Sequence, residues 1–455
     1  MTPAMAKNVK VEALGNDSTL SGLSIPNTTL SPAFNKNTKE YNDLLNDIYC
    51  FGTGLYKLGL KNSRVAVCGR NSYKWVVSHL SNLMGGIVSV PIDKELQLNE
   101  LEESLIRSNV EALVFDEKYK DNIIKIKENG KTNIKFFICM SKLDGFIWYD
   151  ELLEEGKKAL ENGENEFKEY TPNSKNMSIL LFTSGTTSKA KAVMLSQDGI
   201  CANIADLQMV EGVRSTDTNI AFLPFHHIFS STGMLFMMAC GVKTVFPDGL
   251  KYIKQNLHEY EVSVFVGVPL LINKMYETIE KEIEKQGKTK LLKNAIKISN
   301  FLLKFHIDIR KILFRQIVNA LGGKMRLIVA GGAPLEKRIA QGFNDFGIHL
   351  VQGYGLTETS PVISAENDKY IKVALTEDCF IAHTAAMIRK SVLTKNNIKY
   401  ESERMNTLIK GLLDLSKLEN ISGASCLYGA FSGTGISSMD FSSLKTISGS
   451  NAMGS

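Results

Sequence analysis

The pattern of apolar and polar positions divides the chain into three stretches. From Tyr41 to about Val373, short apolar runs alternate with amphipathic segments, whereas the sequence on either side lacks this rhythm. Apolar runs of four to seven residues are typical of buried strands, and apolar positions at three- and four-residue steps are typical of helices. We expect strands at 64–69, 86–92, 112–115, 135–140, 178–182, 219–224, 262–268 and 324–330, and helices at 42–58, 75–84 and 291–321.

This alternation predicts the fold class. Parallel strands need a long crossover connection, usually a helix, and the sheet they form is then covered on both faces. We therefore predict a large α/β body at 39–373 with mostly parallel sheets covered by helices. The flanks are expected to be a polar, β-like or disordered leader at 1–38, an amphipathic helical segment at 374–420 and a Ser/Gly-rich tail at 421–455.

Composition and charge narrow the classes of protein. With 455 residues, 44% apolar and 22% charged, the chain is typical of a soluble protein with two to four domains. The net charge of +5 gives no reason to propose nucleic acid as a partner. The longest apolar stretch, 233–242, is about half of the ~20 residues that a spanning helix needs. The sequence therefore predicts a cytoplasmic protein without a transmembrane segment, and it leaves contact with a membrane surface open.

The seven cysteines are scattered along the chain, and no two form a C-x-x-C pair. An odd, scattered set is a poor disulfide framework, so we expect reduced thiols.

The segment LLFTSGTTSKAKAVMLS, at 180–196, joins a buried strand to a polar loop. A glycine and four hydroxyl side chains gather in this loop: Thr183, Ser184, Gly185, Thr186 and Thr187. The glycine lets the backbone approach an anion, and the hydroxyls lie beside N–H groups that can bind phosphate oxygens. Lys191 adds a mobile positive charge for the β- and γ-phosphates. The Walker A pattern is absent, and a solvated Ser/Thr turn between a strand and a helix would have the same composition.

This segment resembles the signature loop of the adenylate-forming superfamily, T-S-G-T-T-G-x-P-K-G. The five loop residues and Lys191 match it, whereas Ser188 and Ala192 stand in place of glycines and Ala190 in place of proline. Ser and Ala resist positive φ, so a stiffer or differently curved loop is expected. The charged and hydroxyl groups that would bind phosphate are kept.

The segment LPFHHIFSSTG, at 223–233, resembles the part of the same superfamily that carries an aromatic or histidine side chain beside the acyl site. His227 matches that position, and the resemblance implies that it gates the carboxylate against the pyrophosphate exit. A histidine pair at a strand end, bonded to the backbone, would explain the same letters. A zinc site is not supported, because no Cys or carboxylate stands at ligand spacing.

The segment VAGGAPLEKRIA, at 329–340, predicts a strand, a glycine turn and a helix with Pro334 near its first turn. The backbone of Gly331, Gly332 and Ala333 can lie flat against a planar base, because glycine has no side chain to obstruct it. Taken alone, GGAPL is also an ordinary turn between a strand and a helix.

The segment VQGYGLTETSPV, at 351–362, resembles the Y-G-x-T-E block of the superfamily. Tyr354 offers a flat aromatic face for adenine, and Thr357 offers a hydroxyl for the α-phosphate. Glu358 supplies hard oxygen ligands suited to Mg²⁺ shared with phosphates. Outside this context Glu358 would be a solvated loop carboxylate.

Two longer segments, FLLKFHIDIRKILFRQIVNALGGKMRLIVAGGAPL and YNDLLNDIYCFGTGLYKLGLKNSRVAVCGRNSYKWV, resemble long-chain fatty-acyl-CoA ligases, which are AMP-forming acyl-CoA synthetases. The resemblance implies that ATP and a fatty acid give an acyl-adenylate and pyrophosphate, and that CoA then receives the acyl group as a thioester. It implies ATP, Mg²⁺ and CoA as cofactors, and Lys191, Glu358, Thr357 and His227 as catalytic residues. Catalysis would rest on positioning and on charge neutralisation.

The sequence after Val373 departs from the superfamily pattern. It has no Y-x-T-G-D-like segment for the ribose and no matching lysine of the C-terminal domain. Losing a transition-state contact costs roughly a hundredfold in rate, so impaired ligase activity is expected.

The flanks resemble other families. Residues 10–37 are similar to the opening of a bacterial cadherin-like β-sandwich repeat, with a disordered polar leader as the alternative. The segment 401–419 has a coiled-coil seam and is similar to the second helix of a histidine-kinase dimerisation domain. That seam would support a helix-mediated dimer, although a helix packed on the core gives the same stripe. Residues 427–455 resemble one turn of a leucine-rich surface repeat.

Three functions therefore remain open. The first is ATP-dependent activation of a fatty acid by a truncated enzyme body. The second is nucleotide or acyl binding without catalysis, and the third is an interaction protein built on the coiled-coil helix. Three partial families around one enzyme body also predict a chimaera.

Overall fold

The computed structural model describes residues 29–32, 39–183, 190–365, 420–422 and 446–448. The chain divides into two compact units, and each is considered by itself. Unit 1 comprises Met1–Ile204, Val213–Val266 and Asn319–Met325, and unit 2 comprises Ala205–Gly212, Gly267–Val318 and Arg326–Ser455.

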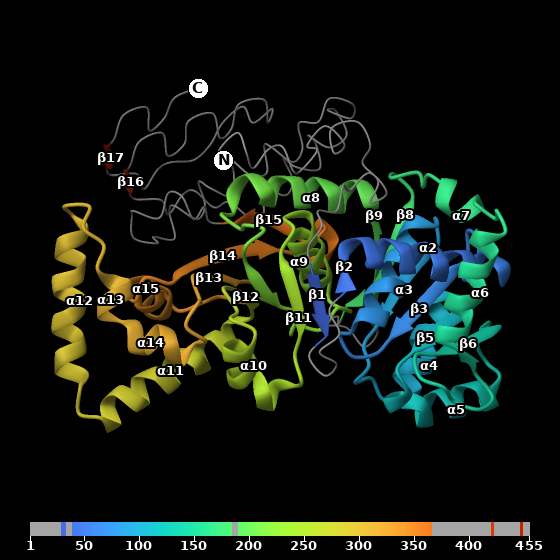
Figure 1. Ribbon diagram of the computed structural model, residues 1–455, viewed down its shortest axis with the longest axis horizontal. Coiled ribbons are helices and arrows are strands. Elements are labelled where there is room, and N and C mark those ends of the chain that lie inside the picture. The colour runs from blue at the N-terminus through green and yellow to red at the C-terminus, as the bar shows by residue number, and fades with distance from the viewer. Residues whose placement is uncertain (1–28, 33–38, 184–189, 366–419, 423–445, 449–455) are drawn as a thin grey trace. The chain divides into compact units, whose positions relative to one another are not determined.

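A seven-stranded sheet in unit 1 has the order β7-β6-β5-β3-β4-β8-β9 (Figure 1). All neighbouring strands are parallel except the hairpin of β8 and β9, which confirms the predicted α/β class. Its strands are β3 (Arg64–Cys68), β4 (Val88–Ile92), β5 (Ala112–Phe115), β6 (Phe136–Cys139), β7 (Ile147–Trp148), β8 (Met177–Thr183) and β9 (Lys191–Ser196). The helices between them are α2 (Tyr41–Lys57), α3 (Tyr73–Met84), α4 (Leu98–Ser108), α5 (Lys120–Asn129), α6 (Tyr149–Glu161) and α7 (Glu166–Glu169).

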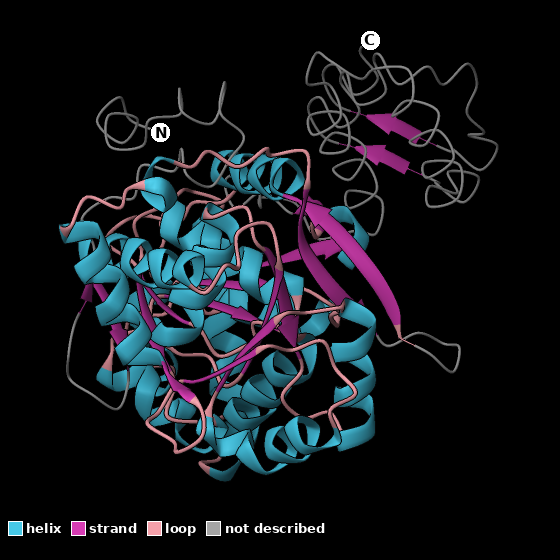
Figure 2. Ribbon diagram, turned by 90° about the vertical axis from the view of Figure 1, so that its right-hand side faces the viewer, coloured by secondary structure: helices cyan, strands magenta, loops and turns pink. Residues whose placement is uncertain are grey.

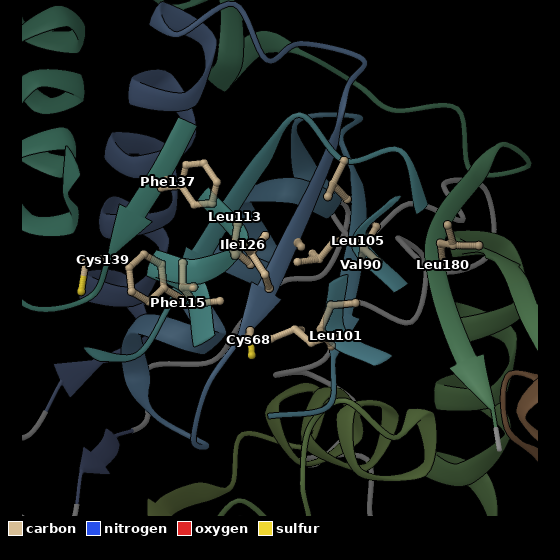
Figure 3. Close-up of a cluster of buried hydrophobic side chains, with 14 residues drawn as sticks. Cys68, Val90, Leu101, Leu105, Leu113, Phe115, Ile126, Phe137, Cys139 and Leu180 are labelled. Carbon is tan, nitrogen blue, oxygen red and sulfur yellow. The ribbon is translucent and has the colours of Figure 1, made fainter. Parts of the chain in front are cut away.

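One face of this sheet is built from alternate strand residues. Ala66 and Cys68 of β3, with their counterparts on β4, β5 and β6, form one buried cluster (Figure 3). Leu101 and Leu105 of α4 and Ile126 of α5 complete the cluster, so these two helices cover this face. Strand residues point alternately to the two faces, so the apolar runs that lack alternation in the sequence belong to strands buried on both sides. Figure 2 shows the strands lying between helices.

Close approach of α2 and α6 depends on two glycines. A Cβ added at Gly156 would lie 1.8 Å from the carbonyl oxygen of Cys50, and one at Gly54 would lie 2.6 Å from that of Leu152. Any larger residue at either position would push the helices apart. The absence of side chains there explains why the two helices pack backbone to backbone.

Unit 1 also contains neighbouring strands in the order β12-β10-β11-β1-β2. They are β12 (Val264–Gly267), β10 (Thr218–Ile220), β11 (Lys243–Phe246), β1 (Thr29–Pro32) and β2 (Lys39–Glu40), accompanied by α9 (Ile228–Ala239) and α10 (Ile253–Glu259). Helix α8 (Gln197–Val210) begins in this unit. Strand β1 pairs in parallel with β11, and it lies in the stretch 10–37 where short strands or loop were expected. The strand expected at 219–224 is wrong in length, because the backbone leaves the ladder after Ile220.

Unit 2 contains the neighbouring strands β15 (Val362–Ala365), β14 (His349–Gly355) and β13 (Leu327–Ala330). Strand β14 is parallel to β13 and antiparallel to β15. The helices are α11 (Pro269–Lys285), α12 (Thr289–Leu303), α13 (Arg310–Leu313) and α15 (Lys337–Asp345), and α14 (Arg315–Ala320) begins in this unit. Pro334 lies two residues before Glu336, the N-cap residue of α15, and so stands near the first turn of the helix but outside it.

The single helix expected at 291–321 is also wrong, because the segment forms α12, α13 and α14. His306 adopts a φ of 63°, which an L residue in a right-handed helix cannot have. Asp308 then accepts the backbone N–H of Arg310 at 3.0 Å and so marks the start of the next helix. The helical spacing of apolar residues in the sequence is not interrupted at His306, so the pattern did not predict this break.

The predicted flanks lie largely outside the described residues. This applies to 1–28 and 33–38 of the cadherin-like leader, to the helix at 401–419 and to most of the tail. The two described pieces of the C-terminal part, β16 (Asn420–Ser422) and β17 (Thr446–Ser448), pair in parallel. Among the described residues, no helix is both long and apolar enough to cross a membrane.

His79 of α3 is a buried titratable group in unit 1. Its Nδ1 lies 2.8 Å from Ser89 Oγ, and its ring lies 4.9 Å from that of Trp75. Burial lowers the pKa of His79 to about 3. In the unfolded chain the same ring takes up a proton near pH ~6.5. The contribution of His79 to the free energy of unfolding is therefore complete above that pH, and it is lost as the pH falls toward the pKa of His79 in the folded protein.

We predict that His79 alone lowers the free energy of unfolding by about 2 kcal/mol between about pH 7 and about pH 5. Urea titrations at both pH values measure this. His79→Gln should remove this part of the pH dependence, and the same change at the exposed His258 should not. An unchanged pH dependence in His79→Gln would contradict the assignment.

Candidate functional site

The carboxyl ends of three neighbouring strands meet at one edge of the seven-stranded sheet in unit 1. Strand β4 is parallel to β3 on one side and to β8 on the other, through the Ser89–Ile179 pair. Loops that follow carboxyl ends of parallel strands are where open α/β sheets place their ligands. The segments after β3, β4 and β8 begin with Gly69, Asp93 and Ser184, so the predicted phosphate loop starts at this edge.

The two limbs of the phosphate loop are described, although Ser184, Gly185, Thr186 and Thr187 lie outside the described residues. Thr183 ends β8 and is directly paired with Lys191, the first residue of β9. The loop therefore joins two antiparallel strands and not a strand and a helix. Lys191 is exposed, so its ammonium group is accessible to an anion at the base of the loop.

Arg107 of α4 holds the second limb of this hairpin. Its Nη2 donates to the carbonyl oxygen of Ala190 at 2.8 Å, and its guanidinium lies 5.2 Å from the ring centre of Phe182. One arginine therefore contacts both limbs at the point where the loop begins and ends. Ala190, where the superfamily has proline, is restrained here by this hydrogen bond to its carbonyl.

Asn71 fixes the segment that carries the two histidines. Its Nδ2 donates to the carbonyl oxygens of Ala221 at 2.8 Å and Leu223 at 2.7 Å, and its Oδ1 accepts the N–H of Phe225 at 3.1 Å. These are the residues that leave the ladder after β10. The amide of Asn71 thus replaces strand partners that the backbone would otherwise lack.

His226 and His227 follow this segment, at the start of α9. Their ring centres are 4.2 Å apart, and His226 Nε2 lies 3.6 Å from Asp93 Oδ1. Burial and the neighbouring His227 lower the pKa of His226 to about 4. Partial desolvation also lowers the pKa of His227, which is the N-cap residue of α9 and remains accessible. The predicted histidine gate therefore lies beside the carboxyl end of β4.

A small apolar cavity of about 20 Å³ lies against α9, bordered by Phe222, Phe225, Gly233, Met234 and Val266 among others. This volume is sufficient for about one water molecule. Gly233 contributes no side chain to it, and a Cβ there would meet only Val266 Cγ1 at 4.0 Å.

In unit 2, the glycine turn and Tyr354 lie at the carboxyl ends of adjacent parallel strands. Ala330, the last residue of β13, is paired with Gln352 of β14, two residues before Tyr354. The turn of Gly331, Gly332 and Ala333 follows directly, and Gly332 has a φ of 84° that favours glycine. Gly332 and Ala333 are exposed and Tyr354 is partly exposed, so a planar group can reach both.

Thr357 and Glu358 lie on the short 3-10 helix η4 (Thr357–Thr359) between β14 and β15. Thr359 Oγ1 accepts the N–H of Leu356 at 3.1 Å and lies 2.7 Å from the carbonyl oxygen of Pro361, which closes the turn. Gly355 allows this closure, because a Cβ there would lie 1.8 Å from Pro361 O. The turn presents the Glu358 carboxylate to solvent.

No group of three or more His, Cys, Asp and Glu side chains that could hold a metal ion occurs within the described residues. An exposed carboxylate such as Glu358 fits Mg²⁺, which takes one or two protein carboxylates together with phosphate oxygens and waters.

The match to known proteins covers the whole α/β body. A family model described as "AMP-binding enzyme" matches residues 27–390. The chain belongs to the AMP-binding enzyme family. This confirms the predicted resemblance to the adenylate-forming acyl-CoA synthetases.

Curated relatives of this chain include long-chain-fatty-acid–CoA ligase 5 of Mus musculus, which is 28% identical over 334 residues, 68% of this chain and 48% of the relative. Long chain acyl-CoA synthetase 4 of Arabidopsis thaliana is 26% identical over 356 residues, 70% of this chain and 52% of the relative. The chain spans about half the length of the curated relatives it matches.

Solved structures of low sequence identity share the fold of this chain. A long-chain-fatty-acid–CoA ligase from Archaeoglobus fulgidus aligns with a TM-score of 0.60 at 17% identity, covering 80% of this chain and 68% of that one. The inhibitor-bound N-terminal domain of FACL13 from Mycobacterium tuberculosis aligns with a TM-score of 0.57 at 18% identity, covering 76% of each chain.

Three residues at this edge of the sheet were missed by the sequence interpretation: Asn71, Asp93 and Arg107. Asn71 and Asp93 had a usable signal, since each is a polar residue just after a buried parallel strand. Arg107 had none, because it lies on the surface of a helix 83 residues from the carbonyl group that it binds.

We predict that Asn71→Ala lowers the free energy of unfolding by about 3 kcal/mol, because three backbone groups lose their partner at about 1 kcal/mol each. The pKa of His226 should rise toward its ordinary value as its segment becomes solvated. Urea titration and histidine NMR titration measure the two effects. Asn133→Ala, on an exposed asparagine, is the control, and equal effects of both changes would contradict the role of Asn71.

Proposed function

We propose that this chain activates a long-chain fatty acid with ATP, forming an acyl-adenylate and pyrophosphate, and then transfers the acyl group to the thiol of CoA with release of AMP. Family membership supports adenylate chemistry, and the relatives, which are long-chain acyl-CoA ligases by name, support a long-chain fatty acid and CoA. The observation that carries the proposal is the hairpin of β8 and β9. It presents Thr183 and the exposed Lys191 as a directly paired couple at the carboxyl edge of the sheet.

In the proposed reaction, a carboxylate oxygen of the fatty acid attacks the α-phosphorus of ATP and pyrophosphate leaves. Both reactants are anionic, so the residues must offset charge repulsion and align the reacting groups. We assign Lys191 and the loop N–H groups to the β- and γ-phosphates, and Thr357 to the α-phosphate. Tyr354 and the Gly331–Ala333 turn would hold the adenine between an aromatic face and bare backbone.

His227 is assigned to the carboxylate. The lowered pKa keeps its ring neutral near neutral pH, so it can line the carboxylate path without forming a fixed ion pair. Asn71 and Asp93 position the ring and its neighbour but do not touch the substrate in this proposal. Glu358 would hold Mg²⁺, which neutralises charge on the phosphate oxygens.

A second candidate is ATP binding without turnover. It is favoured by the phosphate loop, in which Ser188 and Ala192 stand in place of glycines and Ala190 in place of proline. The two candidates share the nucleotide residues and differ only in whether pyrophosphate is released. We also propose that the domain that carries out this chemistry extends over residues 39–373, as expected from the sequence.

We predict that Lys191→Ala weakens ATP binding and lowers any pyrophosphate release on the order of a hundredfold, because one charge that stabilises the phosphates is removed. Calorimetry with ATP measures binding, and a pyrophosphate assay with ATP, Mg²⁺ and palmitate measures turnover. Lys175→Ala, on another exposed lysine of unit 1, is the matched control. ATP binding without pyrophosphate release would select the second candidate. No ATP binding by the unaltered chain would overturn both.

We predict that Glu358→Gln raises the Mg²⁺ concentration needed for half-maximal ATP binding by about tenfold or more, because an amide oxygen carries no charge for the ion. The measurement is ATP calorimetry across a Mg²⁺ series, which does not require turnover. Glu336→Gln, on an exposed glutamate of the same unit, should leave the Mg²⁺ dependence unchanged. If both variants behave alike, Glu358 is not the Mg²⁺ ligand.

A further inference from the structure

Helix α12 of unit 2 and the turn that follows it expose large apolar side chains in a regular row. Leu291 is 66% exposed, Ile298 57%, Phe301 59% and Phe305 61%. Leu291, Ile298 and Phe305 follow one another at steps of seven residues, and Phe301 lies three residues after Ile298. Residues at steps of three, four and seven lie on the same face of a helix, so all four share one face. The rings of Phe301 and Phe305 touch edge to face at 5.3 Å. We call these four residues the apolar stripe.

A row of lysines runs beside the apolar stripe. Lys290, Lys297 and Lys304 each precede a stripe residue by one position, and all three are exposed. One residue corresponds to about 100° around a helix, so the lysine row flanks the stripe along its length. Between Gln286 and Ile307 the sequence has five lysines and no Asp or Glu. The exposed surface of α12 therefore combines an apolar row with positively charged side chains and carries no acidic side chain.

The opposite face of α12 is fixed to its own unit. Ser299 is fully buried, and Asn300 Nδ2 donates to Asp345 Oδ1 of α15 at 2.9 Å. Figure 1 shows α12 upright at the edge of its own unit, with α13 and α15 on one side and no described element of unit 2 on the other. The helix is thus folded and anchored with its apolar stripe directed away from the core.

We propose that α12 docks this protein on an anionic phospholipid surface, with the apolar stripe inserted among the lipids and the lysine row on the headgroup phosphates. Helices that lie in a membrane interface combine an aromatic and aliphatic face with basic residues beside it. Long lysine stems reach the headgroups while their methylene groups cover apolar surface. The inference is independent of the proposed function.

A second copy of this chain is a poorer occupant for the same surface. Pairing two α12 helices would bring two lysine rows together, and like charges across an interface are unfavourable. Anionic lipid instead complements the charge and takes up the aromatic rings. The lysine row therefore favours an anionic lipid surface over a second copy of the chain.

The experiment is sedimentation of the full chain with phosphatidylglycerol vesicles and, separately, with phosphatidylcholine vesicles. We expect binding to the anionic vesicles that weakens with added salt, because screening shortens the reach of the lysines. Lys290→Gln/Lys297→Gln/Lys304→Gln should lower the partition coefficient by roughly a hundredfold, since each lysine near the surface contributes about fivefold. Ile298→Ser/Phe305→Ser should lower it by about tenfold or more.

Matched controls come from unit 1. Lys125→Gln/Lys157→Gln/Lys175→Gln changes three other exposed lysines, and Ile106→Ser changes an apolar side chain that is 42% exposed. Circular dichroism verifies that each variant is folded. Equal binding to both lipids, control variants as defective as the α12 variants, or no vesicle binding would overturn the proposal. It would also be overturned if the stripe variant only converts a dimer into a monomer in analytical ultracentrifugation.

Discussion

The candidate site of unit 1 depends on the parallel pairing of β4 with both β3 and β8. Because the three strands run in one direction, the polar segments that follow them emerge at the same edge of the sheet. This brings the limbs of the phosphate loop to the edge that also carries Asn71 and Asp93. An antiparallel β8 would have placed Thr183 at the opposite edge. The core cluster beneath, filled by alternate residues of these strands and by α4 and α5, holds that pairing in place.

The edge is shaped mainly by residues that bind backbone and have no proposed role in the chemistry. Asn71 satisfies three backbone groups of the segment after β10, and Arg107 binds the limb of the hairpin next to Lys191. Each acts by supplying hydrogen bonds to backbone that has left regular structure. Such groups would otherwise be unpaired at the cost of their desolvation. Backbone that lies outside the regular strands is thereby held in place by side-chain hydrogen bonds.

In unit 2 the segments that follow two parallel strands also emerge at one edge of the sheet. The parallel pair of β13 and β14 places the glycine turn and Tyr354 at neighbouring strand ends, and a tight turn closed by Thr359 presents Glu358. The same unit exposes the apolar stripe of α12, which costs solvation free energy. The lysine row explains how such a surface stays compatible with water while it favours an anionic interface.

The sequence alone determined the α/β class, the positions of most buried strands and the matching blocks of the AMP-binding family, because apolar periodicity and short motifs are local properties. It placed Thr183 and Gly331 directly after buried strands and assigned Lys191, Tyr354 and Glu358 through short motifs, but it did not give their partners. The hairpin at Lys191, the break at His306 and the reach of Asn71 and Arg107 were decided by tertiary structure. Strand pairing, a positive φ within an unbroken apolar period and hydrogen bonds between residues distant in the sequence leave no mark in a local pattern, because their free energy comes from contacts that exist only once the chain is folded.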